Sequence, residues 1–490
     1  MYSNDVLGEL EPCGCRTNPY GGMIRKSNLL KKQEDKDLIL VDGGDLLYPT
    51  TPMPQILKKQ AELQAGYLLK AMEMTGHDVV VPGERDFALG TASFEKLIKA
   101  SKIKFLAANL KKKSGTFLPS STVIKRGGIR VGILGLVGES IPWPSDLKVT
   151  SAIAAAKKEV PELKSKSDVL IVVTHQGLDE DVKLAKAVPG IDIIVGAHSQ
   201  SFLQMPAQIG KTTIYQSSYR NQYVGIVPLH SPFSGKGHEL VGLDASLDDP
   251  EGKPSKMGEF VAEFKKKITE LNDKEEVRLN QVEVKNPEAP ENKFHTFVGC
   301  AECHRTQFDF WRKTSHAKAL HPLLKDKQFQ NKECLGCHSV GLGDPAGFSS
   351  VNALAVLHPT EEGKKGVPLG AEELAPFLKE MVEASSMDSK VTLKRDESES
   401  QPLSMQLARI EKSWAPVQCE NCHNPAKSHP FSGSYTKVVE KNACFKCHSK
   451  ERAPEWYTTA GQPDWDKIAQ KRKLITCPAT PSPSSDDKSG

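Results

Sequence analysis

The stretch Val298-Gly-Cys-Ala-Glu-Cys-His304 decides the fold of the second half of this 490-residue chain. Its Cys-x-x-Cys-His pattern occurs three more times before residue 450. Two thiols one helical turn apart can form thioethers to the two vinyl groups of one porphyrin, and the adjacent imidazole then reaches the iron. The motifs therefore predict four covalent c-type haems, attached through Cys300, Cys303 and His304; Cys334, Cys337 and His338; Cys419, Cys422 and His423; and Cys444, Cys447 and His448.

Zinc binding is the alternative function of these motifs, because paired Cys-x-x-Cys knuckles also bind a metal tetrahedrally. A zinc knuckle requires no particular residue after its second cysteine, whereas every copy in this chain is followed by His. The position after the second cysteine therefore favours haem.

The two halves of the chain differ in composition. Residues 1–245 contain two cysteines and apolar runs such as Val169-Leu-Ile-Val-Val173, whereas the part from residue 295 onward contains nine cysteines and few such runs. We therefore expect haem to form the core of the second half. Helical spacing at 254–277, broken by prolines near 285–294, predicts a helix and linker. The predicted domains are residues 1–245, a linker at 246–294, a haem domain at 295–475 and a disordered tail at 476–490.

Charge and hydropathy limit the partners. The net charge is only +4 and lies in short lysine clusters, which argues against nucleic acid. No apolar stretch reaches the 18 residues of a membrane span. The haem motifs make redox proteins the expected partners, and the oligomeric state stays open. Covalent haem attachment normally takes place outside the plasma membrane. We therefore expect a periplasmic or extracellular protein, with its export signal and the start of its first strand missing from this sequence.

Apolar runs of strand length alternate with amphipathic stretches along residues 1–245, which is typical of an α/β architecture. Ligands of such folds gather at the carboxyl ends of strands, so polar clusters that follow the runs should converge on one site. Four polar clusters follow apolar runs: Asp42-Gly-Gly-Asp45, Gly83-Glu-Arg-Asp86, Thr174-His-Gln-Gly177 and Gly196-Ala-His-Ser-Gln200.

The order of these motifs resembles the 5′-nucleotidase branch of the calcineurin-like metallophosphoesterases. The resemblance covers roughly residues 3–245 and implies a layered sandwich of two β-sheets flanked by helices. It also implies two metal ions around a bridging Asp, which activate water and clamp phosphoryl oxygens. The matching positions are Asp5, Asp45, Asp86, His175 and His198. The family's His, Asn, His and His are replaced by Leu7, Glu84, Arg85 and Gln200.

These replacements fall unevenly on the two implied metal positions. One position keeps Asp45, His175 and His198 and gains Glu84 as an oxygen ligand, which suits Zn, Mn or Fe. The other keeps Asp5 and Asp45 but has lost both imidazoles, so we expect it to be empty. In a second interpretation, which stays open, the two histidines are polar strand ends that only form hydrogen bonds to the neighbouring layer.

Two further features of this half bear on its chemistry. Arg85 stands at the family's catalytic His, so we expect poor phosphoester hydrolysis, because losses within a catalytic unit are more than additive. Cys13 and Cys15, in the loop after the first motif, are a candidate metal or redox site. Buried or free thiols are the alternative there, since cysteines one residue apart do not easily form a relaxed disulfide.

The segment from Phe297 resembles the tetrahaem cytochromes of the c-554 type. Besides the haem motifs, the matching residues are Trp311-Arg-Lys-Thr-Ser-His-Ala317 and Ser428-His429. The resemblance covers about 295–460 and implies a mainly α, haem-cored multihaem domain. It is interrupted by an insertion at about 343–411, which we expect to form a surface excursion.

The resemblance also bears on the sixth ligands of the four irons. His316 and His429 match the family's distal ligands, and His321 and His295 are further candidates, with hydrogen bonding to haem propionates as the alternative. His358, in the insertion, is expected to be exposed. The family's trailing His after Trp465 is missing, so at least one haem should have an exchangeable or non-His sixth position.

The sequence favours an exported electron-transfer cytochrome with a degenerate phosphoesterase-like domain, because the haem motifs are intact and the hydrolase motifs are not. Two alternatives belong to other classes. One is a metal-dependent 5′-nucleotidase or phosphoesterase fused to a cytochrome, and the other is a haem oxidoreductase that acts on a small nitrogen or sulfur compound.

Overall fold

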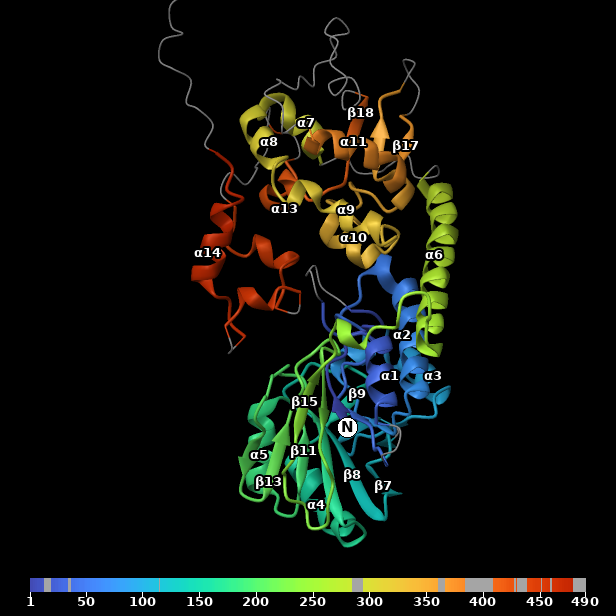
Figure 1. Cartoon of the computed structure of the whole chain (residues 1–490), viewed down its shortest axis with the longest axis vertical. Coiled ribbons are helices and arrows are strands. Elements are labelled where there is room, and N and C mark those ends of the chain that lie inside the picture. Colours follow the sequence, from blue (N-terminus) through green and yellow to red (C-terminus); the bar gives the residue numbers. More distant parts are fainter. Residues whose placement is uncertain are drawn as a thin grey trace, which may run out of the picture. The chain divides into compact units, whose positions relative to one another are not determined.

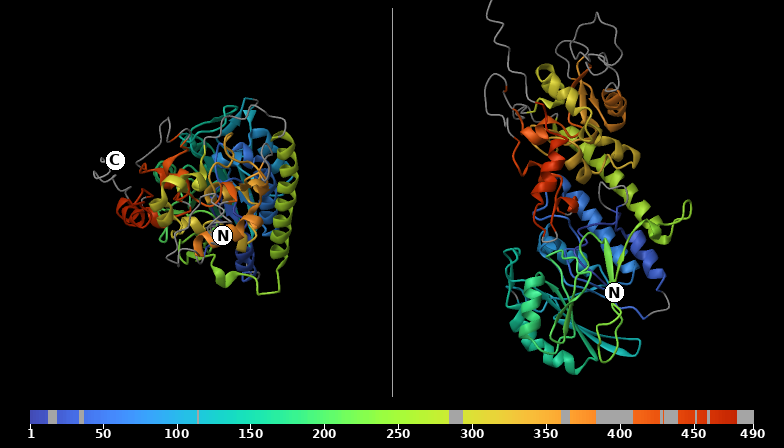
Figure 2. Two further views of the ribbon diagram at one scale, coloured as in Figure 1. Left: turned by 90° about the horizontal axis from the view of Figure 1, so that it is seen from above. Right: turned by 60° about the vertical axis from the view of Figure 1, so that its left-hand side comes forward.

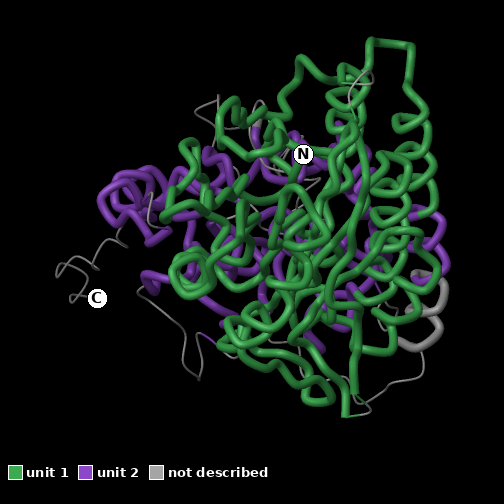
Figure 3. Tube along the Cα trace, turned by 90° about the horizontal axis from the view of Figure 1, so that it is seen from below, with its two compact units in different colours: residues 1–54, 58–267 green, residues 55–57, 268–490 purple. Residues whose placement is uncertain are grey.

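The computed structural model describes residues 1–12, 19–33, 37–113, 115–283, 294–359, 366–383, 409–426, 429, 439–450, 452–458 and 461–478. The chain forms two compact units (Figure 3). Unit 1 contains Met1–Pro54 and Lys58–Lys267, and unit 2 contains Gln55–Leu57 and Ile268–Gly490. Helix α6 (Lys256–Glu283) begins two residues later than the helix predicted at 254–277 and runs past its predicted end, and the division between the units falls within it.

Unit 1 contains two six-stranded sheets within its described residues. In the first sheet β1 to β4 run parallel, and β14 and β15 add antiparallel strands beside β1. Its order is β15 (Glu239–Gly242), β14 (Tyr223–Ile226), β1 (Tyr2–Ser3), β2 (Val41–Asp42), β3 (Val79–Val80) and β4 (Lys104–Phe105).

The second sheet has a parallel centre with one antiparallel strand at each edge. Strand β10 is buried along its whole length. Its nearly continuous apolar sequence is typical of a parallel strand that is covered on both faces. The order is β12 (Ala207–Ile209), β13 (Thr212–Tyr215), β11 (Ile193–Val195), β10 (Val169–His175), β8 (Ile129–Val137) and β7 (Ser121–Arg126). A small third sheet joins β6 (Gly115–Thr116), β5 (Leu110–Lys112) and β9 (Leu147–Val149).

Helices cover the outer face of each large sheet (Figure 1). Helices α4 (Ala152–Ser165) and α5 (Leu178–Ala187) share an apolar core with β8, β10, β11 and β13. Helices α1 (Met23–Lys31), α2 (Lys58–Met74) and α3 (Thr91–Lys99) group on the side of the first sheet. The sheets meet face to face, as the rings of Tyr2 and Tyr215 show with centroids 5.8 Å apart. The predicted α/β layered sandwich is therefore confirmed.

Unit 2 is mainly helical (Figure 2). Its described helices are short and irregularly connected, and one three-stranded sheet, β17-β16-β18, lies among them. Its α-helices are α7 (Thr296–Cys303), α8 (Arg305–Trp311), α9 (Leu320–Lys325), α10 (Lys332–His338), α11 (Ala371–Glu383), α13 (Cys419–His423) and α14 (Trp465–Lys473). Single-turn helices are η1 (Gln55–Leu57), η4 (His316–Lys318), η5 (Val351–Ala353), η7 (Ala443–Lys446) and η8 (Pro454–Trp456), and the strands are β16 (Ala355–Leu357), β17 (Pro368–Leu369) and β18 (Ile410–Ser413).

The insertion at about 343–411 differs from the predicted surface excursion. Its β16, α11 and β18 supply buried residues, including Ala355, Leu374 and Ile410, to one core that also contains Phe297 and Trp311. Side chains therefore provide a substantial core of unit 2, which the composition had assigned to haem. Single apolar residues dispersed among charges hid this core from a search for long apolar runs.

Candidate functional site

Five of the predicted site residues of unit 1 lie where parallel strands end. Asp5 and Asp45 follow β1 and β2, and Glu84 opens the single-turn helix η2 (Glu84–Phe87) after β3. His175 is the last residue of β10, and His198 follows β11. Because the two sheets face each other, residues from both converge at one edge, where ligands of such folds bind.

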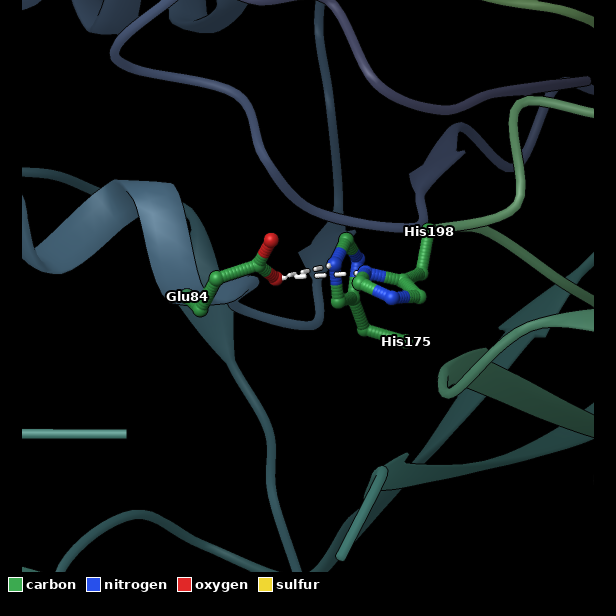
Figure 4. Close-up of side chains that lie close together, drawn as sticks. All are labelled: Glu84, His175 and His198. Atoms are coloured by element: carbon green, nitrogen blue, oxygen red, sulfur yellow. Dashed lines mark hydrogen bonds and ion pairs between the residues drawn. The ribbon is translucent and has the colours of Figure 1, made fainter. Parts of the chain in front are cut away.

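Glu84, His175 and His198 form the tightest group (Figure 4). Glu84 Oε2 lies 2.9 Å from His175 Nε2 and 3.4 Å from His198 Nδ1. A tetrahedral metal with bonds of about 2.1 Å separates its ligand atoms by about 3.4 Å. The two distances from Glu84 Oε2 are close to this separation, all three ligand atoms lie within 4.8 Å of one another, and one oxygen with two nitrogens suits Zn²⁺ or Mn²⁺. The residues therefore fit a divalent metal.

The orientation of His175 supports the same use. Its Nδ1 lies 2.8 Å from the carbonyl oxygen of Gly43, which can only accept a hydrogen bond. Nδ1 therefore carries a proton, and Nε2 faces the carboxylates. Metal-binding histidines are commonly oriented in this way, by a backbone carbonyl at the other ring nitrogen.

The site has an excess of buried negative charge. Burial raises the pKa of Asp5 to about 7 and also raises that of Asp45. Burial opposes protonation of His175, but Asp45 and Glu84 outweigh it and raise the pKa of His175 to about 10. Burial likewise opposes ionisation of Glu84, but hydrogen bonds from the two histidines hold the pKa of Glu84 well below its ordinary range. A cation bound here would satisfy these carboxylates.

The second predicted metal position has a different set of ligand atoms and hydrogen bonds. Asp5, Asp45 and His175 form another group of potential ligand atoms. Asp5 already accepts a hydrogen bond from Asn4 Nδ2 at 2.8 Å and faces the backbone N–H of His198. Leu7, which replaces an imidazole, is a buried apolar side chain. This group therefore offers fewer nitrogen donors than Glu84, His175 and His198.

Arg85 binds the carboxylate of Asp45 with both its side chain and its backbone. Its Nε lies 3.2 Å from Asp45 Oδ2, and its backbone N–H donates to Asp45 Oδ1 at 2.8 Å. Its Nη1 donates to the carbonyl oxygen of Pro49 at 3.0 Å. Asp86, the acidic residue of the same motif, accepts hydrogen bonds from the backbone N–H groups of Leu47 and Gly83 and thus braces the loop.

Two features of the site were missed by the sequence reasoning. Asp181, fully buried at the start of α5, accepts hydrogen bonds from Thr174 Oγ1 at 2.7 Å and Gln176 Nε2 at 2.9 Å. It therefore fixes both neighbours of His175. The second feature is backbone strain, which clusters at functional sites. Left-handed φ angles occur at Asp5, Leu7, Asp45, His198 and Gln200.

Unit 2 pairs two proximal histidines with predicted distal ones. The rings of His304 and His429 have centroids 6.0 Å apart, and those of His316 and His448 are 6.2 Å apart. Metal–imidazole bonds of about 2 Å on each side, with about 1 Å from nitrogen to ring centre, place two axial imidazoles about 6 Å apart. The ring separations of both pairs match this spacing.

The cysteines predicted to attach haem also meet in two pairs. The thiol of Cys337 hydrogen-bonds to Cys447, which together with Arg452 lowers the pKa of Cys337 to about 6, against the effect of burial. Cys419 similarly contacts Cys300. The second and fourth motifs are thus neighbours, as are the first and third.

Glu420 of the third motif holds the first motif in place. Its carboxylate accepts hydrogen bonds from the backbone N–H groups of His295 at 3.2 Å, Thr296 at 2.9 Å and Ala426 at 3.0 Å. Gln418 accepts another from Phe297. Helix α7 therefore begins on side chains that lie more than 100 residues further along the chain.

The other predicted site residues have less distinctive surroundings. His338 Nδ1 bonds to the carbonyl oxygen of Ala319, which leaves Nε2 for an iron. His321 is exposed, and His295 is half-buried. His358 is half-buried, whereas the sequence predicted exposure. Cys13, Cys15 and most of the predicted tail lie outside the described residues.

Comparisons with known proteins identify both halves. Residues 19–202 match the calcineurin-like phosphoesterase family, and residues 299–359 match the family of cytochrome c554 and c-prime. The chain joins a calcineurin-like phosphoesterase domain to a cytochrome c554 domain. The phosphoesterase domain implies a divalent metal and the cytochrome domain implies haem, and both residue sets fit these groups.

Individual relatives match the phosphoesterase domain. The 5′-nucleotidase of Mus musculus is 29% identical over 225 residues, or 41% of this chain and 38% of that protein. An apyrase of Aedes albopictus is 27% identical over 279 residues, or 50% of this chain and 48% of that protein. A 5′-nucleotidase precursor from Thermus thermophilus is a structural neighbour with 20% identity and a TM-score of 0.48, covering 55% of this chain and 58% of the neighbour. The chain thus spans less than half of the length of both relatives.

None of the described helices combines the length and the apolar character that a membrane span requires. A cytochrome domain implies redox partners in general.

Proposed function

We propose that the protein carries electrons through four covalent haems and that its phosphoesterase domain binds one divalent metal but hydrolyses phosphoesters poorly. The observation that carries the proposal is the placement of His429 beside His304 and of His316 beside His448, with ring separations of 6.0 and 6.2 Å. Two imidazoles on one iron are the usual arrangement of low-potential electron carriers. Each bound haem supplies reversible one-electron storage.

The chain's own residues support transfer between haem positions. The contact of Cys337 with Cys447, and that of Cys300 with Cys419, brings together attachment points from different motifs. Trp456 stacks on His448 with ring centroids 4.3 Å apart and fixes the plane of that imidazole. A rigid setting of this kind limits structural change when the charge on an iron changes.

The distal ligands for His338 and His423 stay predictions, with His321 and His295 as the candidates. At one of these irons we propose an exchangeable or non-His sixth position. Because covalent haem attachment normally takes place outside the plasma membrane, we also propose a periplasmic or extracellular location.

Mass spectrometry and spin-state spectroscopy of the complete, haem-loaded protein test the electron-carrier proposal. The denatured chain should carry four added haem masses. H429A and H316A should each convert one low-spin haem to a high-spin form that binds carbon monoxide, because only the proximal imidazole remains. H358A is the matched control and should leave the spectrum unchanged. Fewer haems, or unchanged spectra for both variants, would contradict the proposal.

A hydrolase is the second candidate function, which the convergence of Glu84, His175 and His198 favours. When bound, a divalent metal there would lower the pKa of a bound water and polarise a phosphoryl oxygen. The domain nevertheless lacks the family's histidines at positions 7, 85 and 200. Turnover of a nucleoside monophosphate in the ordinary range of about 1–1000 per second, with added Mn²⁺, would show that the hydrolase candidate is correct.

A further inference from the structure

Arg85 engages both oxygens of Asp45, the most central carboxylate of the site. The side chain of Asp45 is 2% exposed, whereas that of Arg85 is 23% exposed and reaches the site from its open side. The guanidinium is permanently charged, so it remains a cation at every pH at which the protein folds. Asp45 therefore has a resident positive partner in the folded chain.

This partner affects where metal ions can bind. Asp45 is one of the three residues of the group Asp5, Asp45 and His175, so a metal there would use a carboxylate that Arg85 already neutralises. It would also stand next to a fixed positive charge in a buried setting, where like charges repel strongly. The group Glu84, His175 and His198 does not include Asp45. Its ligand oxygen, Glu84 Oε2, lies 2.9 Å from His175 Nε2, whereas Arg85 Nε lies 4.0 Å from the other oxygen, Glu84 Oε1, so the ligand oxygen remains available.

The guanidinium of Arg85 has further N–H donors besides those in the interactions described above. Arginine carries five N–H donors in a planar fork. In this site Nε faces Asp45, and Nη1 donates to the carbonyl oxygen of Pro49. The side chain is partly exposed, so a ligand oxygen can reach the outer edge of the fork. Guanidinium groups recognise phosphate and related oxyanions through such paired N–H donors.

We propose that Arg85 takes the place of a second cation at Asp45, so that one metal and one guanidinium together hold a tetrahedral oxyanion. The inference rests on the proposed metal at Glu84, His175 and His198, and it adds the ligand class. Arg85 opposes metal binding, because it adds positive charge beside the metal. It favours anion binding, because its outer N–H groups face the ligand.

Opposite effects on two ligands provide the test. Isothermal titration of the full haem-loaded protein with Mn²⁺, and then of the Mn²⁺-loaded protein with inorganic phosphate, gives both affinities, and elemental analysis gives the bound manganese. The wild-type protein should bind one Mn²⁺. R85Q should bind Mn²⁺ at least tenfold more tightly and phosphate at least tenfold more weakly. A merely structural role of Arg85 would weaken both.

The matched control is R130Q, which breaks another arginine–aspartate pair of the same domain, with Arg130 Nη2 2.7 Å from Asp168 Oδ1. It should change neither affinity. Two bound Mn²⁺ ions in the wild-type protein, or R85Q affinities that fall together or stay unchanged, would overturn the inference and leave the metal at Glu84 standing. No bound Mn²⁺ at all would overturn the proposed metal and the inference with it.

Discussion

Replacing Asp181 by Asn should stabilise the phosphoesterase domain at neutral and alkaline pH. Asp181 is fully buried, and burial raises its pKa from 3.8 to about 7, although Thr174, Gln176 and Gln216 donate hydrogen bonds to it. The unfolded chain releases this proton near pH 3.8, whereas the folded chain keeps it until about pH 7. Stability that is fully present below pH 3.8 is therefore lost as the pH rises to about 7.

The size of the effect follows from the pKa difference. A raised pKa of about 3 units corresponds to about 4 kcal/mol, at 1.36 kcal/mol per unit. In D181N the new amide N–H₂ faces Gln216 Nε2, another donor, which costs about 1 kcal/mol. The expected net gain is thus about 3 kcal/mol at pH 8. Below pH 3.8 the variant should be slightly less stable than the wild type, because the penalty is absent there.

Denaturant unfolding monitored by fluorescence measures this gain in the full protein. Trp143 is the single tryptophan of residues 1–245, and comparison with W143F separates its signal from that of the four tryptophans after residue 295. A chelator in all samples removes any contribution of bound metal. The control D168N should lose stability at neutral pH, because Arg130 lowers the pKa of Asp168 to about 2. A D181N variant that is less stable than the wild type at pH 8, or a difference that does not vary with pH, would refute the reasoning.

Three further substitutions test other parts of the structure. In G83A the new Cβ would collide with Asp45 Oδ1 and His175 Cε1, so Mn²⁺ affinity by titration should fall at least tenfold; G66A, where a Cβ meets nothing within 4 Å, should not change it. E420A should destabilise the cytochrome domain by about 2–3 kcal/mol in thermal unfolding, because buried N–H groups of α7 lose their acceptor; an unchanged melting temperature would contradict that role. F348A should cost about 3–5 kcal/mol if the insertion is part of the core, as the packing of Phe348 against Trp414 indicates, and a cost below about 1 kcal/mol would show a peripheral insertion.

The sequence was sufficient to predict which residues of the phosphoesterase domain come together. Strands that end at polar clusters can be recognised from apolar runs followed by Asp, His and Gly, and parallel strands bring their carboxyl ends to one edge. The four clusters that contain Asp45, Glu84, His175 and His198 could be named on this basis, and the resemblance to the metallophosphoesterases singled out these residues within them. The fold class of both domains was also predicted, and the family matches confirm it.

The remaining features depend on contacts that no local pattern encodes. Asp181 lies six residues beyond His175 and resembles an ordinary acidic residue in the first turn of a helix. The pairing of Arg85 with Asp45 joins two motifs 40 residues apart. The core of the insertion is formed by residues such as Leu374 and Ile410, which stand next to charged residues in the sequence and gather only when β16, α11 and β18 assemble.

The anchoring of α7 on Glu420 has a consequence for biogenesis. A helix of eight residues is too short to persist alone in water, so Cys300 and Cys303 lie in a flexible peptide until Glu420, more than 100 residues later, has emerged and docked. For the proposed haem-loaded protein, this first attachment sequence would therefore be open to an enzyme that joins haem to thiols. Once the third motif docks, the same peptide becomes a capped helix.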